Sequence, residues 1–174
     1  MRRVHYAAMS ILLAAGLVLV LSPGAAAQVA GLGPSDPVLD RMHDEIFESL
    51  AISSHEFPAK LQEAATKHGH VADLRESDDA RTFSCLRSQA ALLAGIGDLA
   101  GAREYMVKAA DHARARGFVV EAAMAYIDAA ILAKHAKDFE AANELANRAL
   151  GLSAFYQLDD ELRASIVARI DGQK

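Results

Sequence analysis

The chain has 174 residues, of which 52% are hydrophobic, 24% are charged and 6% are aromatic, and its net charge is −5. This balance excludes a mainly disordered chain, and the acidic charge argues against a protein that binds nucleic acid by neutralising phosphates. A single cysteine excludes an internal disulfide framework and a thiolate-rich zinc site.

Residues 1–27 have the three parts of a secretory signal peptide. Two arginines near the start are followed by an apolar run over residues 7–21 and by three alanines at 25–27. The run is shorter than the roughly 20 apolar residues that an uncleaved membrane anchor needs. We therefore expect cleavage before Gln28 and export to the periplasm or the cell exterior. Residues 1–27 contain two arginines and no acidic residue, so their removal changes the net charge from −5 to −7.

After a flexible lead over residues 28–35, residues 36–76 are predicted to form a divergent N-terminal helical pair. Ser35-Asp36-Pro37 is typical of a capped helix start, and apolar residues at helical spacing continue to about Ser53-Ser54. A second, shorter helix is expected to begin near Phe57-Pro58 and to stop at Gly69. Residues 77–174 then predict helices over 80–95, 99–116, 119–137, 139–152 and 160–170, the last one a C-terminal capping helix. The predicted fold class is all-α, because no segment alternates like a strand.

An internal repeat is the strongest pattern in the chain. The segment Gly97–Ala109 aligns without gaps on Lys137–Ala149, 40 residues later. Four aligned pairs are identical: Asp98/Asp138, Ala102/Ala142, Glu104/Glu144 and Ala109/Ala149. A two-helix unit repeated at this period is typical of a stacked helical solenoid.

The two units, at about 82–116 and 121–154, resemble the tetratricopeptide repeat (TPR) family. Gly97-Asp98-Leu99 and Lys137-Asp138-Phe139 match the turn between the A and B helices of that repeat, and Ala90 and Ala130 match its small A-helix position. The chain departs from the pattern at Gln89, where a leucine is expected, and in its missing closing prolines and longer period. The resemblance implies a right-handed stack of antiparallel helix pairs, a TPR-like solenoid; a compact helical bundle is the alternative.

The resemblance also implies a partner-binding groove lined by the A helices. By position, the groove residues are Arg87, Ala91, Met124, Ile127, Ile131 and Lys134. An apolar strip flanked by two basic residues would suit a peptide that carries an acidic group. The alternative is that these side chains simply pack against neighbouring helices.

No catalytic or nucleotide-binding motif occurs, so we expect neither an enzyme nor a cofactor. His68-Gly69-His70 is the one close histidine pair, and with His43 or His55 it offers a metal site. We favour a helix-end role for this pair and expect no metal, and we expect Cys85 to be a small buried hydrophobe.

The function predicted from the sequence is therefore an exported TPR-like module that binds a protein or peptide, with no nucleic acid and no stable membrane insertion after cleavage. One alternative is a structural or self-associating subunit of an envelope complex. Another is a metal or small-ligand binder that depends on His68 and His70.

Overall fold

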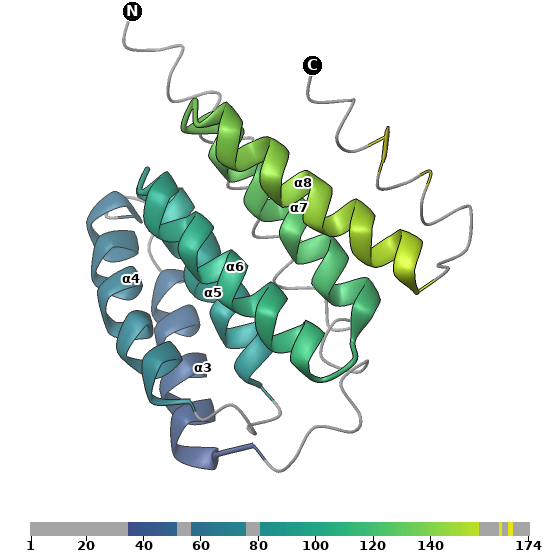
Figure 1. Ribbon diagram of the computed structural model, residues 1–174. Helices are drawn as coiled ribbons and strands as arrows, with labels where there is room; N and C mark the ends of the chain where they lie inside the picture. Colours follow the sequence, from purple (N-terminus) through teal and green to yellow (C-terminus); the bar gives the residue numbers. More distant parts are fainter. Residues whose placement is uncertain (1–34, 52–56, 76–80, 157–163, 165–166, 169–174) are drawn as a thin grey trace, which may run out of the picture. The chain divides into compact units, whose positions relative to one another are not determined.

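The computed structural model describes residues 35–51, 57–75, 81–156, 164 and 167–168, and within them it is helical without any strand (Figure 1). This confirms the all-α prediction. Six helices are described: α3 (Pro37–Ala51), α4 (Phe57–Leu74), α5 (Thr82–Gly95), α6 (Leu99–Ala115), α7 (Val119–His135) and α8 (Phe139–Phe155). They belong to two compact units, one ending at Asp98 and holding α3–α5, the other starting at Leu99 and holding α6–α8.

Most predicted helix positions are confirmed, but the predicted end of the second helix at Gly69 is wrong. Helix α4 continues through Gly69 to Leu74. A glycine inside a helix costs about 1 kcal/mol relative to alanine, and here it makes room for a neighbour. A Cβ atom at Gly69 would lie 3.2 Å from Nε2 of Gln89, whose amide packs against this part of α4.

Several predicted segments lie outside the described residues. They are the signal peptide, nearly all of the flexible lead and most of the capping helix over 160–170.

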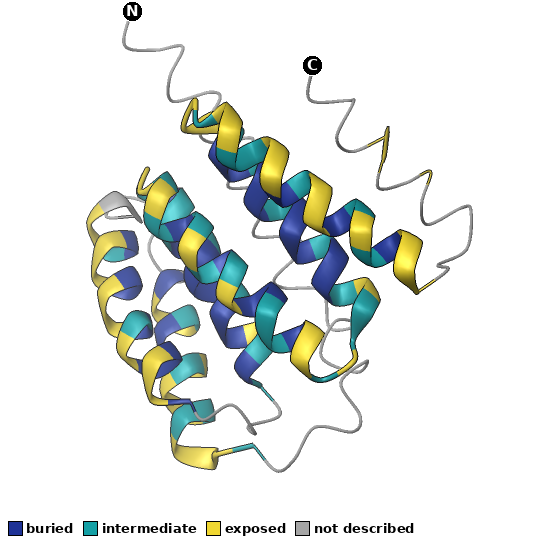
Figure 2. Ribbon diagram, in the orientation of Figure 1, coloured by how far each residue is buried: buried dark blue, intermediate teal, exposed yellow. Residues whose placement is uncertain are grey.

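In the first unit, α4 packs against both α3 and α5. Asp36 caps α3, since its Oδ1 accepts hydrogen bonds from the backbone amides of Val38 and Leu39 at 2.8 and 3.2 Å. This confirms the capped start that Ser35-Asp36-Pro37 predicts. The buried faces of the three helices form the core of this unit (Figure 2). Its hydrophobic members are Ile46, Leu50, Leu61, Ala64, Ala65, Val71, Ala72, Cys85, Leu86, Ala90 and Leu92.

The second unit repeats one helix and one turn every 20 residues. Helices α6, α7 and α8 begin at Leu99, Val119 and Phe139, and each is 17 residues long. Helix α7 packs against both α6 and α8. Small buried residues recur at the contacts, which lets helix backbones approach closely. They are Ala102, Ala109, Ala113, Ala122, Ala129, Ala133, Ala149 and Ser153.

Three turns in the chain share one backbone geometry. Gly97, Gly117 and Lys137 have φ values of 88°, 78° and 63°, in the left-handed region. After each, a backbone amide bonds back to the helix that has just ended; the Asp138 amide, for example, donates to the carbonyl of Ala133 at 2.9 Å. Such turns normally end in glycine, because a side chain in this conformation costs about 1–2 kcal/mol.

Replacing Lys137 by glycine should therefore stabilise the protein. The strain at φ 63° disappears, and part of the gain is offset by the greater freedom of glycine in the unfolded chain. We expect Lys137→Gly to raise the free energy of unfolding by about 0.5–1 kcal/mol in urea titrations. The matched control is Gly117→Ala, where a Cβ atom would meet no atom within 4 Å, so only the backbone conformation is tested. The free energy of unfolding of Gly117→Ala should fall by about 1 kcal/mol. A lower free energy of unfolding in Lys137→Gly would contradict this account.

Candidate functional site

The six residues predicted to line a groove fall in the two units, so they are described separately. Arg87 and Ala91 lie on α5 in the first unit, and both are half-buried. The other four lie on α7 in the second unit, and one of them does not line a surface: Ile127 is 0% exposed and belongs to the core.

The remaining face of α7 carries a partly exposed strip. Met124, Ile131 and Lys134 are half-buried, and Asp128 lies between them with similar exposure. The spacing of four, three and three residues places all four side chains along one side of the helix. We call these four residues the α7 strip. Ile127 lies on the same side of the helix, three residues after Met124 and four before Ile131, and it is nevertheless fully buried, which helical spacing alone does not predict.

The histidine pair in the sequence is not a pair in the structure. His68 is 0% exposed, whereas His70 is exposed on the same helix. Two residues along an α-helix turn the side chain through about 200°, so the two rings point to opposite sides. Because α4 continues past Gly69, the helix-end role predicted for His68 and His70 is wrong.

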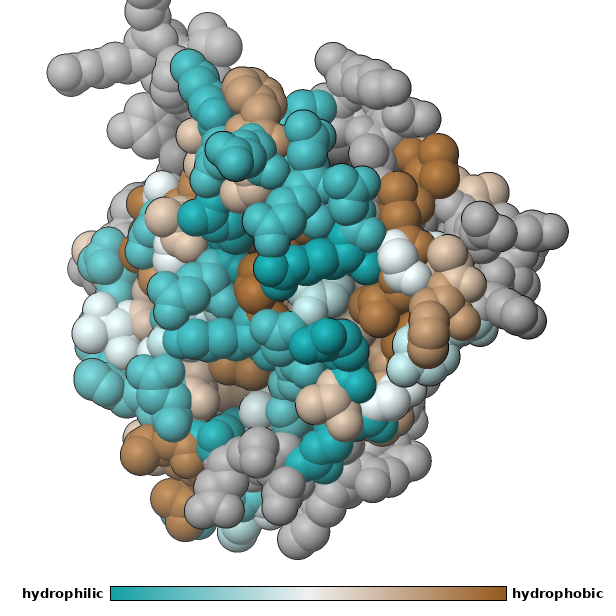
Figure 3. Space-filling view, viewed as in Figure 1, coloured by the Kyte–Doolittle hydropathy of each residue, from teal (hydrophilic) through white to brown (hydrophobic). Residues whose placement is uncertain are grey.

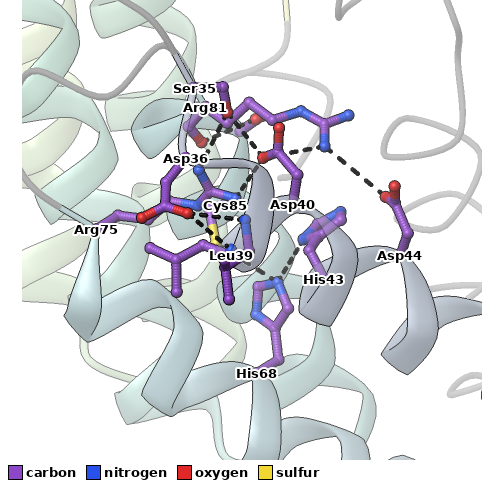
Figure 4. Close-up of polar contacts among 12 residues, drawn as sticks. Ser35, Asp36, Leu39, Asp40, His43, Asp44, His68, Arg75, Arg81 and Cys85 are labelled. Carbon is purple, nitrogen blue, oxygen red and sulfur yellow. Dashed lines mark hydrogen bonds and ion pairs between the residues drawn. The ribbon is translucent and has the colours of Figure 1, made fainter.

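His68 instead meets one residue from each neighbouring helix. Its Nε2 lies 2.8 Å from Nδ1 of His43 on α3 and 3.6 Å from Sγ of Cys85 on α5. All three potential ligand atoms lie within 4.8 Å of one another. Figure 4 shows the imidazole rings of His43 and His68 joined by a dashed line, and ring planes 61° apart show that the two meet edge-on. We call these three residues the His–His–Cys cluster.

Gln89 fixes the orientation of the central ring. Its amide Nε2 donates to the carbonyl of Ala65 at 2.9 Å, so its Oε1 faces Nδ1 of His68 at 3.0 Å. An amide oxygen only accepts, and therefore Nδ1 of neutral His68 carries the hydrogen and Nε2 carries the lone pair. That lone pair points at His43 and Cys85, so His43 must donate from Nδ1 in this arrangement.

The polar surroundings of the cluster include two carboxylates and two arginines. The buried guanidinium of Arg75 donates to Oδ1 of Asp40 at 2.8 Å, and Ser35 donates to the same oxygen. Arg81 lies 3.3 Å from Asp40 and 3.8 Å from Asp44. These groups lie beside His43, which is three residues after Asp40 on α3 (Figure 4).

Burial keeps both histidines neutral. It lowers the pKa of His68 to about 4, with the neighbouring His43 adding to the effect. Burial also lowers the pKa of His43 to about 4, helped by the positive charges of Arg81 and Arg75 and opposed by Asp40. The ring of Phe47 packs against both imidazoles, with centroids 4.8 Å from His43 and 5.5 Å from His68. The cluster therefore holds two neutral imidazoles beside the sulfur of Cys85, with the ring of Phe47 packed against both histidines.

A pattern in the sequence does point to this cluster, but it was missed because the helix was predicted to end at Gly69. If α4 is continued to Leu74, His68 falls on the same side as Leu61, Ala65 and Ala72, at helical spacing. A histidine on such a face requires a polar partner inside the core. The partner itself, Gln89, was visible only as a departure from the TPR pattern.

The low pKa values predict that metal-free protein loses stability in mild acid. Unfolded histidine has a pKa near 6.5, so between pH 6.5 and 4 the unfolded chain binds more protons than the folded one. The free energy of unfolding is therefore not reduced by these histidines above pH 6.5, and it falls as the pH drops toward 4. We expect a loss on the order of 2 kcal/mol between pH 7 and pH 5, measured by urea unfolding with a chelator present.

Two variants test whether the buried histidines cause the loss of stability in acid. His43→Gln should make the dependence clearly weaker, because one of the two buried imidazoles is gone. His70→Gln changes an exposed histidine on the same helix as His68 and should leave it unaltered. An equally steep loss in His43→Gln would show that other groups cause it.

The chain matches no protein-family model, no curated protein and no solved structure. Its function must therefore be argued from its own residues.

Proposed function

We propose that the chain is an exported helical-repeat protein of the TPR type that binds a protein or peptide partner through the α7 strip. A binding role is favoured over an enzymatic one. The proposal is supported by the 20-residue register of α6–α8, since two helices per unit then give the 40-residue period found in the sequence. The stacking of successive pairs into a right-handed solenoid with a capping helix is part of the proposal.

The observation that carries the proposal is the partial exposure of α7. A helix that packs against two others needs an apolar surface on those two sides, and α7 also keeps apolar side chains on its third side. Met124 and Ile131 lie there half-buried, and Val120 at the start of the helix is 39% exposed. On the face in Figure 3, hydrophilic side chains cover much of the surface, and hydrophobic ones gather along its right edge and at its lower left.

The side chains of the strip support a partner with an apolar and acidic binding segment. Met124 and Ile131 are seven residues apart, about 10 Å along the helix, which matches two apolar side chains of a helical or extended peptide. Lys134 adds a positive charge at the C-terminal end of the strip, where an acidic group of the peptide would be attracted. The adaptable thioether of Met124 is suited to contacts of this kind.

A second candidate, self-association, has one observation in its favour. Helix α8 exposes aromatic residues near its ends: Phe139 is 60%, Phe155 is 80% and Tyr156 is 50% exposed. The rings of Phe155 and Tyr156 lie against each other with centroids 5.0 Å apart. Exposed aromatics are enriched at interfaces, so this end of α8 would suit contact with a copy of the chain or another envelope protein.

Partner binding is tested with a protein captured by the native chain, purified and titrated directly. We expect Met124→Glu and Ile131→Gln each to weaken binding at least about tenfold, because they place polar groups in the apolar part of the contact. Phe155→Ser, on another helix, is the matched control and should keep the affinity. Ile127 is unsuitable for this test because it is buried, and circular dichroism should show native helicity for each variant.

The two candidates then give different results. A partner that binds both strip variants as tightly as the native chain would contradict the proposal. Capture of copies of the chain alone, with a sedimentation coefficient that falls on dilution and in Phe155→Ser, would favour self-association instead.

Export is proposed from residues 1–27. No helix in the described part of the chain is long and apolar enough to span a membrane. We expect the mass of the protein recovered from the exported fraction to correspond to a chain that begins at Gln28. Replacing Ala27 by leucine should block cleavage, because the peptidase requires a small residue there, while Gln28→Asn should be processed normally. Recovery of intact Met1 in the exported fraction would contradict the prediction.

A further inference from the structure

We propose that His43, His68 and Cys85 bind one thiophilic transition-metal ion, and that Cu(I) is preferred to Zn(II). The ligand atoms are Nδ1 of His43, Nε2 of His68 and Sγ of Cys85, one from each helix of the α3–α5 unit. The site is separate from the α7 strip, so the inference does not depend on partner binding.

The spacing of the three atoms is close to that of a three-coordinate site. With metal–nitrogen bonds of about 2.0 Å and metal–sulfur bonds of about 2.3 Å, neighbouring ligand atoms lie roughly 3.3–3.8 Å apart. Here the two nitrogens are 2.8 Å apart and His68 is 3.6 Å from the sulfur, with all pairs within 4.8 Å. An ion would need to push the rings apart by about half an ångström and draw His43 and Cys85 together.

The hydrogen-bond network already presents the correct nitrogen of His68. Metal-binding histidines usually donate their other N–H to a carbonyl or carboxylate, which holds the ring in place. Gln89 supplies that acceptor, and it is 2% exposed and itself held by the carbonyl of Ala65. Gly69 leaves room for the amide, because a Cβ atom there would meet it at 3.2 Å. The hydrogen bond from Nδ1 of His68 to Gln89 is therefore built into the packing of α4 against α5.

The proton balance of binding follows from the same network. In the metal-free state a hydrogen on Nδ1 of His43 lies between the two rings. The ion takes its place: His43 changes to the tautomer with hydrogen on Nε2, and the thiol of Cys85 gives its proton to the solvent. Binding of one ion should therefore release one proton.

Charge and coordination number favour Cu(I). The thiolate is a soft ligand and imidazole an intermediate one, and a set of two imidazoles and one thiolate suits copper(I) and zinc. A thiolate and Cu(I) together carry no net charge, whereas Zn(II) would leave a buried positive charge near Arg75 and Arg81. Zinc also prefers four ligands, and among the described residues only these three bring His, Cys, Asp or Glu ligand atoms together in such a group. His43 is partly exposed and offers the route by which the ion enters.

The test is an anaerobic titration of the purified protein with Cu(I), in competition with a chromogenic copper(I) chelator. We expect one equivalent to bind, with release of one proton, and the X-ray absorption spectrum to show one sulfur and two nitrogen neighbours. Cys85→Ser and His43→Gln should each lower the affinity at least tenfold. His70→Gln is the matched control and should bind like the native protein, and a parallel titration with Zn(II) should show weaker binding.

Three outcomes would overturn the proposal. The first is no binding in competition with the chelator, and the second is equal binding by the native protein, Cys85→Ser and His43→Gln. The third is a site that takes Zn(II) but not Cu(I). Since His43 is partly exposed, His43→Gln should fold even if Cys85→Ser does not, and its circular dichroism and unfolding curve would establish this.

Discussion

The first unit depends on one buried histidine and the amide that holds it. His68 contacts α3 through His43 and α5 through Gln89 and Cys85, so the three helices share one polar centre. A polar group inside a core must be satisfied or it costs several kcal/mol, and here each nitrogen of the ring has a partner. This requirement fixes the rotation of all three helices about their axes more narrowly than apolar packing alone would do.

The sequence predicted the second unit better than the first, for a physical reason. In α6–α8, the alanines at fixed offsets and the 20-residue spacing of helix and turn both indicate where each helix begins. The predicted starts of all three helices were therefore correct. In the first unit Gly69 was taken as a helix end, because glycine commonly ends helices. Its actual role depends on Gln89, a residue 20 positions later, which local patterns do not include.

The candidate sites show the same limit. Three of the four α7 positions inferred from the TPR resemblance are partly exposed, but Ile127, on the same side of the helix, is in the core, and helical spacing alone does not distinguish it from the others. The His–His–Cys cluster brings together residues 43, 68 and 85, which no spacing rule connects. The departure from the TPR pattern at Gln89 was the clue, since a local rule is often broken where a site needs a particular group.

The burial of Cys85 has a consequence for cross-linking between copies of the chain. Cys85 is 1% exposed, so the thiol of a second chain cannot reach its sulfur while the three helices remain packed. A mixed disulfide can form only during the intervals when α5 separates from α4. The rate at which the thiol forms a disulfide with a second chain thus reports how often this unit opens, and the packing of the unit protects the chain from cross-linking.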